Sequence, residues 1–180
     1  MNSQPLRDAI RHYATERHYR LETLERWLGL GDDDARALYR LATSLRLGEN
    51  QLRDLWQWAA DIAVREQTTL AAVLEAPEIT AALEAKWSRN DRLQRVKHIL
   101  RRRRFPQLCQ AEDRARSLIE AAALPASVDL ALPRFFEGEE VVVTCRGKTP
   151  AELQAALQAA LRWTSTQACA ELFALLGGEA

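Results

Sequence analysis

Residues 86–108 read KWSRNDRLQRVKHILRRRRFPQL, and the change of pattern inside this stretch predicts how the chain is organised. Apolar residues recur at helical spacing from position 93 to position 100, so we expect an amphipathic helix over residues 89–103. Pro106 disfavours helical geometry at Phe105, which predicts that the helix ends at the arginine run. The chain is therefore expected to divide at this point into a domain of residues 1–104 and a unit of residues 105–180.

The first of these regions reads as a series of short helices. Leucine, isoleucine, alanine and tryptophan follow helical spacing in six segments, which cover about residues 6–13, 20–28, 32–46, 49–66, 69–74 and 77–83. Gly29 follows the second segment, where glycine favours the left-handed backbone of a helix end. No internal repeat emerges, so a multi-helix domain is expected rather than a solenoid.

The second region predicts a different order of elements. An amphipathic helix is expected up to about residue 124, followed by alternating apolar residues at 128–132 and a β-branched run at 141–144. The loop of residues 133–138 joins them as a hairpin. Thr149, Pro150 and Glu152 then provide the N-cap, first-turn proline and capping glutamate of a helix. The fold class is mainly α with a small β-hairpin, in which the C-terminal unit has the order helix, hairpin, helix.

Composition excludes several classes of protein. The chain has 180 residues, 25 basic and 25 acidic side chains and 47% apolar residues, which is typical of a globular protein. It contains neither an apolar run long enough to cross a membrane nor a signal-peptide core, so a soluble, cytoplasmic protein without membrane contact is expected. Its three cysteines are widely spaced and predict neither a disulfide framework nor a zinc site.

Catalytic motifs are scarce. The sequence has no phosphate-binding glycine loop, no nucleophile elbow and no zinc-protease motif, and none of its three histidines has a partner at ligand spacing. Three carboxylates lie close together in the expected hairpin turn, where acidic residues are ordinary, at Glu137, Glu139 and Glu140. We therefore expect no enzymatic activity, no cofactor and no metal.

The basic helix is the strongest functional signal. Residues 86–104 carry nine basic side chains and one acidic side chain, although the whole chain is neutral. Such a helix can lie along phosphates without reading bases. The residues expected to contact nucleic acid are Arg89, Arg92, Arg95, Lys97, Arg101, Arg102, Arg103 and Arg104. In the alternative interpretation, the helix dipole favours these cations and they pair with acidic surfaces on either side.

A helix-turn-helix motif is a weaker possibility. The segments around Trp27 and Leu38, with Gly29 between them, have the order of that motif. Glu25 stands where the motif usually has a small residue, and residues 32–34 are three aspartates that would repel phosphates. An ordinary helical packing unit is therefore preferred.

From Leu45 onward the order of features resembles the region that follows the DNA-binding helices of ParB-type partition proteins. The residues that carry the resemblance are Leu45-Arg46-Leu47 before Asn50-Gln51, the helix of residues 55–65, the run from Leu100 to Leu108, Ala111-Glu112, Leu124-Pro125 and Phe135-Phe136-Glu137-Gly138. The resemblance covers about three quarters of the chain. It implies a role in chromosome or plasmid partition.

The resemblance also implies self-association, because some proteins of that family end in a helix, two strands and a helix that form a homodimer. The residues to which it assigns dimerisation are Leu153, Leu157, Leu161 and Leu172. The family's sheet contacts DNA through lysines, whereas this hairpin carries four acidic and three basic residues and does not match that pattern. The family's nucleotide-binding domain has no counterpart here, so no nucleotide cofactor is implied.

These observations leave two functions open. The first is a non-enzymatic, homodimeric, DNA-associated accessory protein with non-specific phosphate contacts from the helix within residues 86–104. The alternative is a protein-interaction or adaptor domain without nucleic-acid binding. The position of the arginines discriminates between them, because a contiguous exposed stripe favours DNA and pairing with neighbouring helices favours the adaptor.

Overall fold

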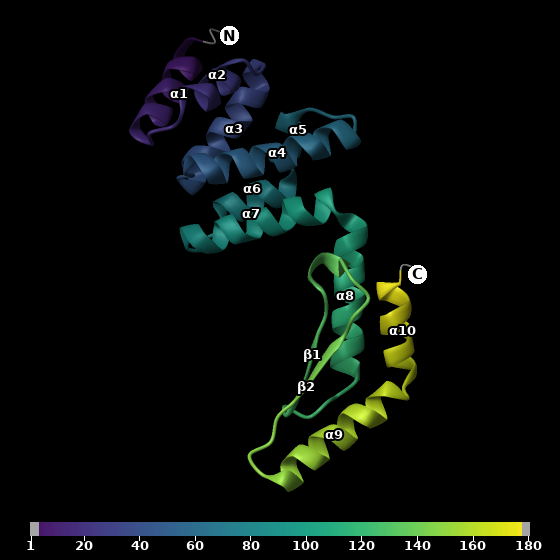
Figure 1. Cartoon of the computed structure of the whole chain (residues 1–180). Coiled ribbons are helices and arrows are strands. Elements are labelled where there is room, and N and C mark those ends of the chain that lie inside the picture. The colour runs from purple at the N-terminus through teal and green to yellow at the C-terminus, as the bar shows by residue number, and fades with distance from the viewer. Residues whose placement is uncertain (1–3, 178–180) are drawn as a thin grey trace. The chain divides into compact units, whose positions relative to one another are not determined.

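The computed structural model describes residues 4–177, which form a mainly helical protein with one small β-hairpin (Figure 1). The expected fold class is confirmed. The chain divides into two compact units, unit 1 (Met1–Phe105) and unit 2 (Pro106–Ala180), one residue beyond the boundary expected from the sequence. Among the described helices, none is both long and apolar enough to cross a bilayer.

Unit 1 consists of seven helices along its described part. Their bounds are α1 Gln4–Glu16, α2 Leu21–Leu28, α3 Asp32–Leu45, α4 Glu49–Arg65, α5 Leu70–Leu74, α6 Pro77–Glu84 and α7 Arg89–Arg104. Helix α4 packs against α5 and α7, while α3 packs against α5, and α6 lies on α7 (Figure 1). The core between them is continuous and includes Trp27, Leu38, Leu55, Ile62 and Val96.

The C-terminal end of α3 is held by side chains from elsewhere in unit 1. Arg46 turns the chain with a left-handed backbone, at φ 46°. The Tyr13 hydroxyl donates to the Ala42 carbonyl at 2.8 Å, and the Tyr19 hydroxyl donates to the Leu47 carbonyl at 2.8 Å. Burial raises the pKa of both tyrosines, so their hydroxyls remain protonated donors. These bonds join α1 and the segment after it to the chain at and beyond the end of α3.

The expectation of a left-handed Gly29 is wrong. Gly29 has φ −77° and its amide donates to the Glu25 carbonyl at 2.9 Å, so it extends the helical geometry of α2. The chain changes direction two residues later at Gly31, which is extended with ψ 154°. Gly29 is therefore the C-cap of α2, but its backbone is in the right-handed helical region.

Unit 2 contains the helices α8 (Pro106–Ala121), α9 (Pro150–Thr164) and α10 (Gln167–Leu176) and a two-stranded sheet. The strands β1 (Val128–Ala131) and β2 (Val142–Cys145) are antiparallel, with Val128 opposite Cys145 and Ala131 opposite Val142. A single 3-10 turn, η1 (Arg134–Phe136), lies in the connection between the strands. Helices α8 and α10 pack around Trp163, and the sheet packs on α9.

The turn from β2 into α9 depends on local contacts that the sequence predicts. The Thr149 hydroxyl accepts from the Glu152 amide at 3.2 Å, and the Glu152 carboxylate accepts from the Lys148 amide at 2.7 Å. These bonds confirm the expected helix start. Gly147 is required here because a Cβ at this position would lie 2.8 Å from the Leu153 Cα. The first turn of α9 is thereby fixed close to the end of β2.

Candidate functional site

Helix α7 carries the cations that the sequence analysis assigned to nucleic-acid binding. The Ser88 hydroxyl accepts from the Asp91 amide at 3.2 Å and caps the helix, which ends at Arg104 before Pro106. Its apolar residues Leu93, Val96, Ile99 and Leu100 are buried in the core of unit 1. With one face covered, the eight cations are distributed over the flanks and the solvent face of the helix.

Arg89 and Arg92 hold the ends of other helices. The Arg89 guanidinium donates to the carbonyl of Leu45 at 2.7 Å and to Gln51 Oε1 at 2.9 Å. It also donates to the Arg46 carbonyl at 3.2 Å, so it completes the C-terminal cap of α3. Arg92 donates to the Leu83 carbonyl near the end of α6 at 3.0 Å. Both arginines therefore serve the packing of unit 1.

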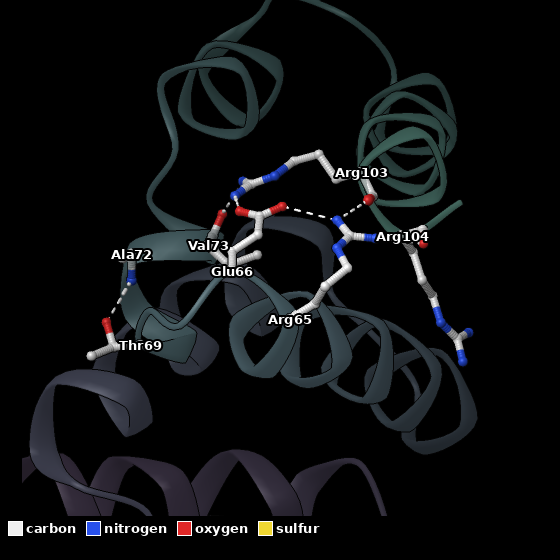
Figure 2. A network of polar contacts seen from close by, with 7 residues as sticks. All are labelled: Arg65, Glu66, Thr69, Ala72, Val73, Arg103 and Arg104. Atoms are coloured by element: carbon white, nitrogen blue, oxygen red, sulfur yellow. Dashed lines mark hydrogen bonds and ion pairs between the residues drawn. The ribbon is translucent and has the colours of Figure 1, made fainter. Parts of the chain in front are cut away.

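The last turn of α7 is tied to the end of α4 by a network of charged groups, drawn in Figure 2. The guanidinium of Arg103 pairs with the Glu66 carboxylate at 2.6 Å. Arg65 pairs with the other oxygen of Glu66 at 3.0 Å and donates to the Arg103 carbonyl and to that of Arg104, the latter at 2.7 Å (Figure 2). The hydrogen bond from Arg103 is the main cause that lowers the pKa of Glu66. Glu66 is consequently ionised at neutral pH.

Arg104 is engaged by residues of both α4 and its own helix end. Its guanidinium pairs with the Asp61 carboxylate at 2.7 Å. The same group lies 4.7 Å from the centre of the Phe105 ring and 6.0 Å from that of the Trp58 ring, within cation–π range. Four of the eight predicted cations thus make contacts that stabilise unit 1.

The other four cations lie elsewhere around the helix. Arg95 and Arg102 are exposed, while Lys97 and Arg101 are half-buried. Arg101 and Arg102 also take part in polar or electrostatic contacts. Arg95, Arg102 and His98 share one face at 100° per residue and line a shallow hollow of about 370 Å³ beside Glu78 of α6. The basic surface is therefore narrower than the sequence analysis expected.

In unit 2, helix α9 presents a row of leucines to solvent. Leu153, Leu157 and Leu161 follow each other at intervals of four residues and are 40%, 54% and 70% exposed. Ala156, Ala160 and Trp163 occupy another face of the same helix and are buried. The helix consequently has one apolar face inside unit 2 and a second apolar face that unit 2 does not cover. We call this second face the α9 leucine stripe.

Leu172, which the sequence analysis grouped with these leucines, lies in a different place. It is 1% exposed and packs in the core of unit 2 with Leu118 and Trp163. Because a side chain buried by its own unit has no surface left for a partner, its assignment to the dimer interface is corrected. Leu172 stabilises the packing of α10 on α8.

Unit 2 has one feature that its sequence does not predict. A cleft of about 620 Å³ lies between α8 and the connection that follows β1. Its lining includes Ile119, Leu132 and Phe136, and Phe135 stands beside it with 58% of its surface exposed. The available signal was the apolar pair Phe135-Phe136 in a turn, because exposed turns seldom carry two adjacent aromatic residues.

No arrangement in the described residues suggests catalytic chemistry. Across residues 4–177, no three histidine, cysteine or acidic side chains gather where they could hold a metal ion. The three glutamates of the hairpin connection are exposed. Cys109 and Cys169 are buried, Cys145 is half-buried, and burial raises the pKa of the Cys169 thiol. A raised pKa makes that thiol a poor nucleophile.

The first turn of α3, which would face DNA in a helix-turn-helix, is used inside unit 1. The Asp34 carboxylate accepts from the Ala71 amide at 2.8 Å, and Asp33 pairs with Arg36 at 3.0 Å. Six residues of α3, from Ala35 to Leu45, are buried. This helix is therefore part of the core packing.

No protein-family model matches the chain, and neither do the curated proteins or the solved structures with which it was compared. The resemblance to ParB-type proteins stays a prediction from the residues named above. Function is inferred below from the surfaces of the two units.

Proposed function

We propose that this protein is a non-enzymatic interaction protein that acts as a homodimer, with the α9 leucine stripe as the contact between its two copies. The observation that carries the proposal is the exposure of three leucines that lie four residues apart on one face of α9. Single exposed leucines are ordinary on protein surfaces, whereas a contiguous apolar stripe marks an interaction site. We propose that the protein acts in the cytoplasm, which is compatible with a homodimeric interaction protein and with a DNA-associated one.

A second copy of α9 is a suitable partner for this stripe. In a two-fold symmetric dimer the same patch on each copy meets its counterpart, so a stripe of leucines covers itself. Helix α9 has 15 residues, and Leu157 lies near its middle. Two such helices packed together at Leu157 would bring six partly exposed leucines into contact, and complete burial of one fully exposed leucine contributes about 1.5–3 kcal/mol. Because the three leucines are 40%, 54% and 70% exposed, each contributes part of that amount against an association cost of about 4–15 kcal/mol.

The experiment is a measurement of solution mass by sedimentation equilibrium on the full chain and two variants. Replacing both Leu157 and Leu161 with Asp is expected to convert the dimer into a monomer, because two carboxylates cannot be buried against apolar side chains. Leu21→Asp is the matched control, since Leu21 is 68% exposed on α2 of unit 1. A dimer that survives the double substitution, with helical content unchanged by circular dichroism, contradicts the proposal.

A second candidate function, association with DNA through phosphates, is favoured by the solvent face of α7. Arg95 and Arg102 are exposed and lie on one face with His98, so they can approach a phosphate backbone together. This proposal no longer includes Arg89, Arg92, Arg103 and Arg104, because their guanidinium groups are engaged within unit 1.

Binding to random double-stranded DNA at several salt concentrations tests this second function. Replacing Arg95 and Arg102 with Glu should weaken binding and lower the salt slope by about 0.9 for each phosphate contact that is lost. Arg53→Glu serves as the control, because Arg53 is exposed on α4. If wild-type protein does not bind DNA at low salt, the homodimeric interaction protein without nucleic-acid contact is retained.

A further inference from the structure

The cleft of unit 2 is an apolar cavity at the surface. Helix α8 contributes Ala115 and Ile119, and the chain after β1 contributes Leu132, Pro133 and Phe136. The volume of about 620 Å³ exceeds the space that one side chain requires. A site of this composition favours the insertion of bulky apolar groups.

The backbone beside the cleft is in a rare conformation. Phe135 and Phe136 have φ values of 57° and 58°, the left-handed region that bulky side chains seldom adopt. Two such residues in succession persist only where the surrounding structure holds them, and strained residues of this kind cluster at binding sites. Here the conformation leaves Phe136 half-buried in the cleft lining and leaves Phe135 exposed beside it. An exposed aromatic residue is a typical anchor of a protein interface.

The charged side chains of the cleft lining are mostly negative, because Glu112 and Glu120 lie on its α8 wall. In the chain, Glu137, Glu139 and Glu140 follow Phe136 and are exposed, and one basic residue, Arg134, precedes Phe135. Arg116 lies on the same wall but pairs with Asp113 at 3.1 Å, which offsets its charge. From residue 106 onward the chain has ten acidic and six basic side chains. A partner with electrostatic complementarity to this surface carries positive charge.

We propose that this cleft docks a basic segment of a partner protein, with one or two bulky apolar side chains inserted beside Phe135 and with lysines or arginines facing the glutamates. The apolar lining provides the contact area, and the acidic border selects the flanking charges. The inference is independent of the dimer, because the cleft and the α9 leucine stripe share no residue.

The probe is a fluorescently labelled synthetic peptide with a central Leu-Phe pair and three lysines on each side, titrated with the full chain and followed by anisotropy. The wild-type chain is expected to bind this peptide with an affinity that falls as salt rises. Phe135→Ala should weaken binding by roughly tenfold or more, because truncation of an aromatic anchor removes most of its contact. Phe173→Ala is the matched control, since Phe173 is 47% exposed on α10 of the same unit and should leave binding unchanged.

Two further peptides distinguish the apolar contact from the charge. A peptide with Ala-Ala in place of Leu-Phe, and a peptide with glutamates in place of the lysines, should both bind much more weakly than the probe. Equal binding of either peptide contradicts the proposal, and so does equal binding of the probe by Phe135→Ala. A wild-type chain that does not bind the probe also overturns it. If Phe135→Ala lowers the solution mass instead, a second copy occupies the cleft and the partner proposal is wrong.

Discussion

Helices α7 and α9 differ in where their arginines and leucines lie. Helix α7 has a run of cations that suggests a solvated surface, yet Arg89, Arg92, Arg103 and Arg104 are bound to carbonyls and carboxylates of unit 1. Helix α9 has leucines that suggest a core, yet three of them are exposed. Charged residues of α7 thus tie neighbouring helices of unit 1 to one another, while three leucines of α9 in unit 2 are exposed. Residue type alone is therefore a poor guide to which helix makes external contacts.

The contrast between the two leucine positions gives the largest expected effect. Leu172→Ala should lower the free energy of unfolding of unit 2 by about 3 kcal/mol, because it opens a cavity around a fully buried side chain. Leu161→Ala should change the stability of the isolated chain by less than about 0.5 kcal/mol while weakening self-association. Urea unfolding of both variants at low protein concentration measures the difference. Equal effects on stability would remove the distinction between core and stripe.

The same contrast applies to the arginines of α7. Arg89→Ala should destabilise unit 1 by about 2 kcal/mol, because it leaves the carbonyls at the end of α3 with one donor fewer. Arg95→Ala, on the solvent face, should lie within about 0.5 kcal/mol of wild type. Thermal unfolding followed by circular dichroism compares the two. An Arg95 variant as unstable as the Arg89 variant would mean that the solvent face of α7 is also structural.

Replacement of Gly147 tests how closely β2 and the first turn of α9 approach each other. Gly147→Ala should destabilise this unit by about 1–3 kcal/mol, because the added Cβ meets the backbone of Leu153 and forces the first turn of α9 away from β2. Unit 1 should be unaffected. Amide hydrogen exchange resolves the two units, and faster exchange is expected in β2 and α9 only. Unchanged protection there would contradict the close packing of the turn.

The smallest effect is the pH dependence of the network at Glu66. Because the folded-state pKa of Glu66 is lowered, its contribution is present above the ordinary glutamate value of about 4.5 and is lost as pH falls through the lower folded value. The carboxylate is about one third exposed, so the contribution should stay below about 1 kcal/mol. Glu66→Gln should therefore be less stable than wild type at pH 7, and the difference should shrink in acid. A difference that grows in acid has the wrong sign for this network.

Much of the fold follows from local signals in the sequence. Helical spacing, Pro106 and the cap at Thr149 predicted the helix boundaries, because each signal acts within one turn. The turn residues between the two runs predicted the hairpin for the same reason. The wrong expectation at Gly29 has a different origin, since a glycine permits a left-handed backbone without requiring it.

The candidate surfaces were less predictable because their partners are distant in the chain. Arg89 bonds to Leu45 and Arg103 pairs with Glu66, which are 44 and 37 residues away. The resemblance implied self-association through the terminal helices, and it could not say that Leu172 of α10 is buried while three leucines of α9 are exposed. The cleft beside Phe135 depends on a backbone conformation that the residue types disfavour.

The most direct test of the central claim is the solution mass of the wild-type chain over a series of protein concentrations. One chain has a mass of 20.4 kDa. We predict a species of two chains that dissociates to one chain on dilution, because an isologous contact through the α9 leucine stripe closes at two copies. A mass of one chain at every concentration would contradict the account.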